Sequence, residues 1–172
     1  MKNSIYVLAF LLVCFSCQTE KKIGYVENGT VINGYQEKKD IESKYQAMES
    51  RFNKKADSIG KAFQLEVQQT QIDARRATQK KAQELMQGLQ QKQQLLQQQM
   101  QLEQQQLAQA FQAEIDSLIV KVKDFVKTYG KDHNYTYILG TSDAAASVLY
   151  GIEENNLTQV ILDALNADYS KE

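Results

Sequence analysis

The sequence contains no proline, and its eight glycines leave one long stretch almost free of them. Between Lys61 and Tyr129 the only glycine is Gly88. Proline removes a backbone donor and glycine adds unfolded-state entropy, so both residues interrupt helices. Because the stretch is also rich in Gln, Lys, Glu, Ala and Leu, it is predicted to form one or two uninterrupted helices. A structure that long and thin excludes the compact core of an enzyme.

Cysteine is also scarce, and both copies lie near the N-terminus. Lys2 followed by the apolar run 5–13 is typical of a signal peptide and is too short for a stable membrane span. The small residue Ser16 directly precedes Cys17, as in a bacterial lipobox, so Cys17 is the predicted lipidation site. The alternative is an ordinary secretory signal that leaves Cys17 as a free thiol. The expected segments are a signal peptide at residues 1–16 and a lipidated tether at residues 17–21, with no disulfide in the mature chain.

Residue types that carry catalysis are equally few. His133 is the only histidine, and no Cys, Asp or Glu stands at metal-ligand spacing from it. It follows the second helical stretch, where an interaction with the helix dipole is the simplest role. The motifs of zinc proteases, of dinucleotide and nucleotide phosphate loops, and of nucleophile elbows are all missing. No catalytic residue, metal or cofactor is expected, and a formal net charge of −1 gives no reason to expect nucleic acid.

Apolar residues recur at alternating spacings of four and three, which is typical of a coiled-coil seam. The first seam comprises Ile41, Tyr45, Met48, Phe52, Ala56, Ile59 and Phe63. The second comprises Met100, Gln104, Leu107, Phe111, Ile115, Leu118, Val122, Phe125 and Tyr129. The two seams predict an antiparallel helical hairpin over residues 34–132 with its tip at about 82–90, where Gly88 lies. The open alternatives are one continuous helix and, for the glutamine-rich residues 64–112, disorder.

Short segments rich in β-branched and aromatic residues lie on both sides of this hairpin. The predicted strands are residues 22–26, 135–139 and 147–150, with a hairpin loop at 140–146 between the last two. Asn28-Gly29 and Asn33-Gly34 are turn signals that precede the first long helix. Thr158 is the predicted N-cap of a C-terminal helix. The residues of that helix expected to cover the sheet are Val160, Ile161, Ala164 and Leu165.

The predicted fold class is therefore mainly α with a small β head. The head is discontinuous and comprises residues 22–33 plus 133–172. Three short strands bury little area, so oligomerisation is expected to complete the head. The tyrosines of the strands are expected to pack in the core or between subunits, and a carbohydrate-binding or base-stacking platform is the alternative. They are Tyr25, Tyr135, Tyr137 and Tyr150.

Taken in order along the chain, these features resemble the family of periplasmic chaperones called Skp or OmpH. The resemblance is carried by Lys22 to Val26, the glutamine-rich hairpin, Tyr135 to Leu139, Val148 to Tyr150, and Asn156 to Asn166. It implies long antiparallel coiled-coil hairpins, or tentacles, that project from a trimeric β-barrel-like association domain around a cavity. It also implies an ATP-independent holdase that binds unfolded outer-membrane proteins in the periplasm and prevents their aggregation, with no cofactor.

The resemblance also sets expectations about partners and location. The expected partners are unfolded outer-membrane proteins, two further copies in a homotrimer, the membrane and the outer-membrane assembly machinery. Family members are commonly soluble and strongly basic, so this chain departs in its anchor and its net charge. With Cys17 acylated, the chain is expected to be lipid-anchored in the periplasm, at the outer membrane rather than the inner. The expected trimer interface comprises Ile23, Tyr25, Val26, Tyr137, Leu139 and Leu149.

Charge near the predicted tip is positive even though the whole chain is nearly neutral. Residues 74–101 contain five cations against Glu84 alone, with Leu and Met between them. Positive charge speeds encounter with a partner, and flexible apolar side chains adapt to many sequences. A solvated basic face above an ordinary seam is the alternative. The expected client-binding residues are Arg75, Arg76, Lys80, Lys81, Leu85, Met86, Leu89, Lys92, Leu96 and Met100.

A structural role is the alternative function, in which the chain is a membrane-tethered coiled-coil spacer of the cell envelope. A holdase should leave adaptable apolar side chains facing a cavity, whereas a spacer should bury its seams and keep its faces polar. Polar residues at seam positions, such as Gln104, are compatible with both the holdase and the spacer. The resemblance favours the chaperone.

Overall fold

The computed structural model describes residues 21–142 and 145–171. The chain divides into two compact units by its internal contacts. The first unit comprises the described residues up to Val31 together with those of 123–165, and the second comprises residues 32–122 and 166–171. The predicted signal peptide and the lipidation site Cys17 lie outside the described residues.

The first unit contains a two-stranded parallel sheet of β1 (Ile23–Glu27) and β2 (Tyr137–Thr141). The register pairs Ile23 with Tyr137 and continues to Glu27 with Thr141. The predicted third strand at 147–150 is wrong, because this segment has no strand structure in the described chain. The other side of β1 is met instead by a bridge from Tyr25 to Asn156. A strand needs a paired neighbour, and among the described residues no strand pairs with 147–150.

The segment between β1 and the first long helix is helical rather than a pair of turns. It forms α2 (Asn28–Gly34), so the turns predicted at Asn28-Gly29 and Asn33-Gly34 are wrong. The Thr30 hydroxyl donates to the Glu27 carboxylate at 3.0 Å, which places a negative charge at the start of this helix, where the helix dipole favours it. Val31 of α2 is fully buried.

The C-terminal helix is α5 (Thr158–Tyr169), and it follows the short 3-10 turn η1 (Glu153–Asn155). Thr158 is its first residue but not its cap, because the Thr158 hydroxyl accepts a hydrogen bond from the Glu27 backbone N–H at 3.0 Å. The Asn156 side-chain oxygen accepts from the Thr158 N–H at 3.1 Å instead. Of the residues expected to cover the sheet, Ile161 and Leu165 are buried, whereas Val160 is about half exposed.

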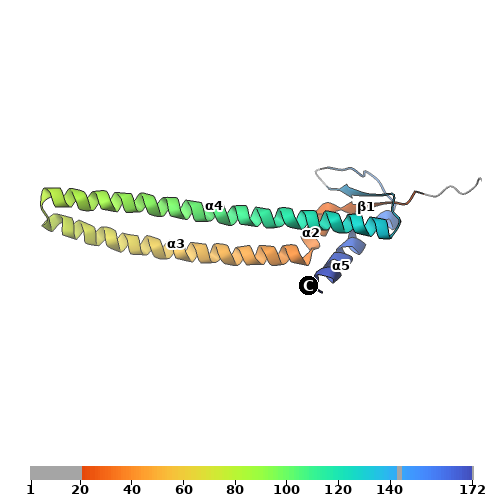
Figure 1. Ribbon diagram of the computed structural model, residues 1–172, viewed down its shortest axis with the longest axis horizontal. Helices are drawn as coiled ribbons and strands as arrows, with labels where there is room; N and C mark the ends of the chain where they lie inside the picture. The colour runs from red at the N-terminus through yellow and green to blue at the C-terminus, as the bar shows by residue number, and fades with distance from the viewer. Residues whose placement is uncertain (1–20, 143–144, 172) are drawn as a thin grey trace, which may run out of the picture. The chain divides into compact units, whose positions relative to one another are not determined.

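The second unit contains α3 (Gln36–Arg76) and the part of α4 (Gln79–Asp132) up to Val122, and the two helices form the predicted hairpin (Figure 1). Its turn lies at Ala77–Thr78, so the tip predicted at 82–90 is wrong. Ala77 is extended, and the Thr78 hydroxyl accepts from the Lys81 N–H at 3.4 Å. Threonine is a favoured helix N-cap, and this local signal decides the turn. Gly88 lies inside α4.

The two predicted seams face each other along the hairpin, but most of their side chains are only half-buried. In this unit Tyr45, Leu118 and Val122 are buried, and Leu118 is 2% exposed. Phe52, Phe63, Leu107 and Phe111 are intermediate. Two helices alone cannot enclose both seams, so one side of each seam remains open to solvent.

Candidate functional site

Four ion pairs join α3 to α4 along one face of the hairpin. They are Glu37–Lys121 (2.9 Å), Lys44–Glu114 (2.5 Å), Lys55–Glu103 (2.6 Å) and Glu66–Lys92. Along α3 the residue numbers rise by 7, 11 and 11, and along α4 they fall by the same steps. Steps of 7 and 11 residues return to nearly the same side of a helix. We call this side the ion-pair face, and its constant register aligns the two helices.

The ion pairs and the apolar seam share a network near Lys44. Glu114 accepts a hydrogen bond from the Tyr45 hydroxyl at 2.9 Å and pairs with Lys44. The hydrogen bond from Lys44, followed by the one from Tyr45, lowers the pKa of Glu114 below its ordinary value of 4.5. Burial, followed by the hydrogen bond to Glu114, raises the pKa of Tyr45. The Tyr45 ring meets Phe111 edge-on, with ring centroids 5.1 Å apart.

Two grooves open between the helices on the side away from these ion pairs. Lys44 and Lys55 each come one residue before a seam position, whereas groove residues such as Gln46, Asn53 and Gly60 come one residue after. Residues at these two positions lie about 200° apart around a helix. We call the second side the groove face. On α4, Glu103 and Glu114 likewise come one residue before a seam position. The groove residues Gln97 and Ala108 come one residue after Leu96 and Leu107.

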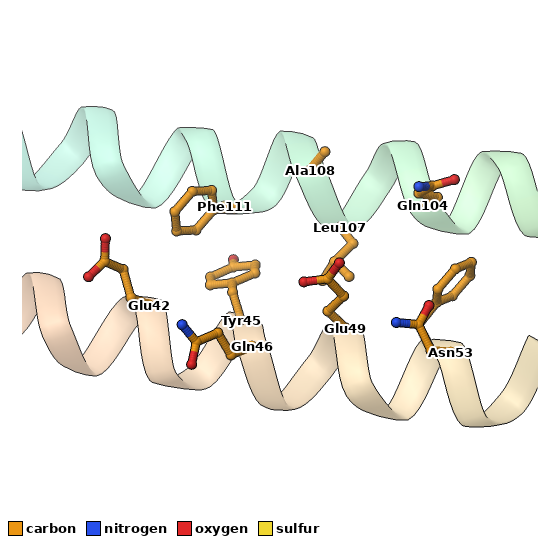
Figure 2. A pocket seen from close by; sticks show the side chains of 10 residues that line it. Glu42, Tyr45, Gln46, Glu49, Asn53, Gln104, Leu107, Ala108 and Phe111 are labelled. Carbon is orange, nitrogen blue, oxygen red and sulfur yellow. The ribbon is translucent and has the colours of Figure 1, made fainter.

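The first groove has a volume of about 390 Å³, and its aromatic floor is visible from close by (Figure 2). Tyr45 and Phe111 point toward each other from opposite helices, and Leu107 reaches down from α4 beside them. The remaining rim is small or polar. The lining residues are Glu42, Tyr45, Gln46, Glu49, Phe52, Asn53, Gln104, Leu107, Ala108 and Phe111.

The second groove lies further toward the turn and has a volume of about 370 Å³. Its lining combines apolar seam residues with the small residues Ala56 and Gly60 and two glutamines. Large apolar side chains outside the grooves are also exposed along the hairpin, and they are Met48, Leu65, Ile72, Met86, Leu95 and Leu102. The lining residues of the second groove are Ala56, Ile59, Gly60, Phe63, Gln93, Leu96, Gln97 and Met100.

The structure distributes the predicted client-binding residues over four places. The exposed cations Arg75, Arg76, Lys80 and Lys81 flank the turn. Lys92 forms the ion pair with Glu66 and is therefore part of the ion-pair face. Leu85 and Leu89 are half-buried between the turn and the grooves, and Met86 is exposed. Only Leu96 and Met100 line a groove.

The first groove and the aromatic side chains of both grooves were missed by the sequence reasoning. Phe52, Phe63 and Phe111 were assigned only to the seams, as packing residues. The signal that would have found the grooves is the set of small residues in and beside the seams. Ala56 is a seam residue, and Gly60 and Ala108 each follow one; small side chains at these positions leave the neighbouring rings uncovered.

In the first unit, most of the predicted interface residues are exposed. Leu149 is 92% exposed, Tyr137 is 59% exposed, and Ile23 and Leu139 are each more than 40% exposed. Val26 does not belong with them, because it is 3% exposed and is therefore buried within its own subunit. Tyr25 is half-buried and packs over Gly151, where an added Cβ would lie 2.5 Å from the ring. Tyr150, which was expected to pack in the core or between subunits, is also exposed, as is Ile152, which the sequence reasoning did not name.

Comparison with known proteins decides the family. A family model described as outer membrane protein (OmpH-like) matches residues 22–165. The chain belongs to the OmpH-like family. The match begins next to β1 and ends within α5, so it includes the whole hairpin, and the resemblance inferred from the sequence is confirmed.

A solved OmpH-like structure shares the fold. It is the crystal structure of a candidate outer membrane chaperone (OmpH-like) from Caulobacter crescentus CB15. Its sequence is 12% identical, the alignment covers 88% of this chain and 87% of that one, and the TM-score is 0.75. Identity this low shows a common fold alone. None of the curated proteins compared matches this chain.

Within residues 21–142 and 145–171, no helix is both long and apolar enough to cross a bilayer. In the same part of the chain no group of three or more His, Cys, Asp or Glu side chains is placed to hold a metal ion. His133 lies at the end of α4, where its ring stacks on Tyr129 with centroids 3.9 Å apart.

Proposed function

We propose that this chain is an ATP-independent holdase that binds unfolded outer-membrane proteins in the periplasm and prevents their aggregation. The observation that carries the proposal is the groove face, where Phe52, Phe63 and Phe111 are only half-buried and line open grooves. A structural spacer would bury these seams and keep its faces polar, so the open grooves favour a binding function. Membership of the OmpH-like family and the described role of the Caulobacter protein support the same function.

The chemistry of the groove face suits unfolded chains of many sequences. Its apolar floor offers contact area for exposed aromatic and aliphatic side chains, and burial of apolar area stabilises binding by roughly 25 cal/mol per Å². Glutamine, asparagine and glutamate side chains on the rim offer hydrogen-bond partners without demanding one sequence. The four cations that flank the turn would attract acidic segments before contact.

The aggregation assay tests this function directly. A porin unfolded in urea and diluted into buffer without nucleotide should remain soluble in the presence of the protein. Ala108→Gln introduces a polar side chain into the first groove and should weaken the protection several-fold, because it covers apolar floor. Ala110→Gln is the matched control, since Ala110 is an exposed alanine of the same helix that does not line the groove.

Three outcomes separate the alternatives. If the wild-type protein does not reduce the turbidity of the diluted porin, the holdase function is contradicted and the structural spacer remains. Equal loss in Ala108→Gln and Ala110→Gln would contradict a role for the first groove. Protection by the wild type and the control, with weaker protection by Ala108→Gln, supports both the function and its location.

We also propose that Cys17 is acylated and attaches the protein to the outer membrane from the periplasmic side. A lipid anchor plus a second signal makes membrane attachment durable without a spanning helix. Cys17→Ala should therefore move the protein from the membrane fraction to the soluble fraction of lysed cells, with Cys14→Ala as the matched control. Continued membrane association of Cys17→Ala would point to an uncleaved signal instead.

A further inference from the structure

The first unit contains a groove of about 390 Å³ whose charged lining residues are all lysines. Lys123, Lys127 and Lys131 line it from α4, and residues 135–138 complete it. A spacing of four places the three lysines on one side of the helix. All three are exposed, and none forms an ion pair within the described residues. We call these three residues the lysine stripe.

The carboxylates nearest in sequence do not neutralise the lysine stripe. Asp124 and Asp132 each follow a stripe lysine by one residue, so they project about 100° further around the helix. Neither lines the groove. Like charges four residues apart on a helix destabilise it, and an external anion bound along the stripe would relieve that repulsion.

The groove lies next to the point where the N-terminal segment joins the sheet. The Lys22 ammonium lies 4.0 Å from the ring centroid of Tyr135, which lines the groove, and it donates to the His133 carbonyl oxygen at 3.3 Å. The predicted lipidation site Cys17 precedes Lys22 by five residues. Five extended residues span at most about 17 Å, so an acyl chain on Cys17 would keep Lys22 within about that distance of the lipid headgroups.

An aromatic residue of the groove suits the same environment. Tyr135 lines it beside the lysines, under the ammonium group of Lys22. Tyrosine is enriched at membrane–water interfaces, because its ring is apolar and its hydroxyl stays hydrated. Lysine and tyrosine together are therefore the combination expected where a protein surface meets a bilayer.

We propose that the lysine stripe is a second membrane contact, which binds the anionic phospholipid headgroups of the bilayer that holds the N-terminal anchor. A polybasic surface is one of the signals that strengthen a lipid anchor. Each basic side chain close to an acidic membrane surface strengthens binding about fivefold. The interaction is electrostatic, so it weakens as salt shortens the Debye length.

The test measures vesicle binding without the acyl group. The full chain carrying Cys17→Ser is sedimented with vesicles of equal parts phosphatidylglycerol and phosphatidylcholine, and with vesicles of phosphatidylcholine alone. Lys123→Gln, Lys127→Gln and Lys131→Gln together should lower binding to the anionic vesicles about a hundredfold, which is about fivefold for each lysine. The matched control changes three exposed lysines of α3 that form no ion pair within the described residues, namely Lys39→Gln, Lys54→Gln and Lys61→Gln.

Two further variants make the result decisive. Replacing the three stripe lysines with arginine keeps the charge and should restore binding, and Lys127→Gln alone should lower it about fivefold. The N-terminal residues are common to all variants, so differences between variants report on the lysines.

The proposal is overturned if the stripe variant binds anionic vesicles as well as the wild type, or if the α3 control loses as much. Competition by soluble glycerol phosphate at the same phosphate concentration would also overturn it, because that result indicates a site for a free anion. A specific loss in the stripe variant with rescue by arginine supports it.

Discussion

Glycine has different roles at different positions of this fold. Gly60 and Gly88 lie inside the long helices, and a Cβ added at either would meet no atom within 4 Å. Gly24 lies in β1, and a Cβ added there would lie 2.5 Å from a Leu157 methyl carbon. The first two positions tolerate a larger residue, whereas the third requires glycine for packing.

Gly88→Ala should stabilise the protein by about 0.5–1 kcal/mol, because alanine loses less backbone entropy on helix formation. Gly24→Ala should destabilise it by about 1–3 kcal/mol, because the added methyl group overpacks the contact with Leu157. Chemical denaturation followed by circular dichroism measures both values. Loss of stability in Gly88→Ala would show that residue 88 needs glycine, as a turn would.

The two threonines at helix starts, Thr78 and Thr158, differ in how far the sequence alone predicts their roles. Thr78 is a standard N-cap residue, and the turn at 77–78 was within reach of sequence reasoning, which chose Gly88 instead. The role of Thr158 could not be predicted from the sequence, because the Thr158 hydroxyl accepts a hydrogen bond from the backbone N–H of Glu27, 131 residues away. A helix cap can be predicted from the sequence only when no distant residue competes for the side chain that would form it.

At the scale of elements, the hairpin has two unlike sides. The ion-pair face carries four pairs in one register, and the groove face carries the open aromatic floor. Exposed ion pairs add little to stability, so the main effect of the four pairs is to align the helices. That alignment keeps Tyr45 opposite Phe111.

The pKa of Glu114 predicts how acid affects the hairpin. A carboxyl group whose folded pKa is lowered stabilises the fold above its unfolded pKa, and this contribution is lost as the pH falls through the folded value. Thermal melting of the wild type should therefore be steady near neutral pH and fall below about pH 4.5. Glu114→Gln should melt at lower temperature than the wild type at pH 7 and show a smaller decrease in acid.

Glu49→Gln is the control for this experiment, because Glu49 forms no ion pair within the described residues. It should keep the pH dependence of the wild type. An unchanged acid response in Glu114→Gln would mean that other carboxylates dominate the effect, which would contradict the assigned role of Glu114.

At the scale of the whole molecule, the first unit leaves a large apolar surface uncovered. A two-stranded sheet is marginal in isolation, and its exposed neighbours include Leu149, Tyr150 and Ile152. We propose that these residues pack between subunits of a homotrimer, which would remove their apolar side chains from solvent.

Leu149→Asp tests the trimer. Leu149 is almost fully exposed in one subunit, so the substitution should not disturb an isolated chain, but a charge buried between subunits would be strongly unfavourable. Light scattering of the Cys17→Ser background should give a trimer at micromolar concentration and a smaller species for Leu149→Asp. Leu102→Asp is the control, since Leu102 is an exposed residue of the hairpin.

A monomer in the Cys17→Ser background itself would contradict the trimer. A trimer that persists in Leu149→Asp would remove Leu149 from the interface without excluding the assembly.

The sequence by itself determined the long helices, the fact that they pair as a hairpin, and the family. Helix formation follows from residue type and from periodicity over neighbouring residues, which are both local properties. The tertiary structure alone decided that β1 pairs with β2, that Val26 is buried within its own subunit, and that the two aromatic grooves lie away from the ion pairs. These features depend on contacts between residues far apart in the chain, such as Glu27 with Thr158 and Lys44 with Glu114, and no local pattern encodes such partners.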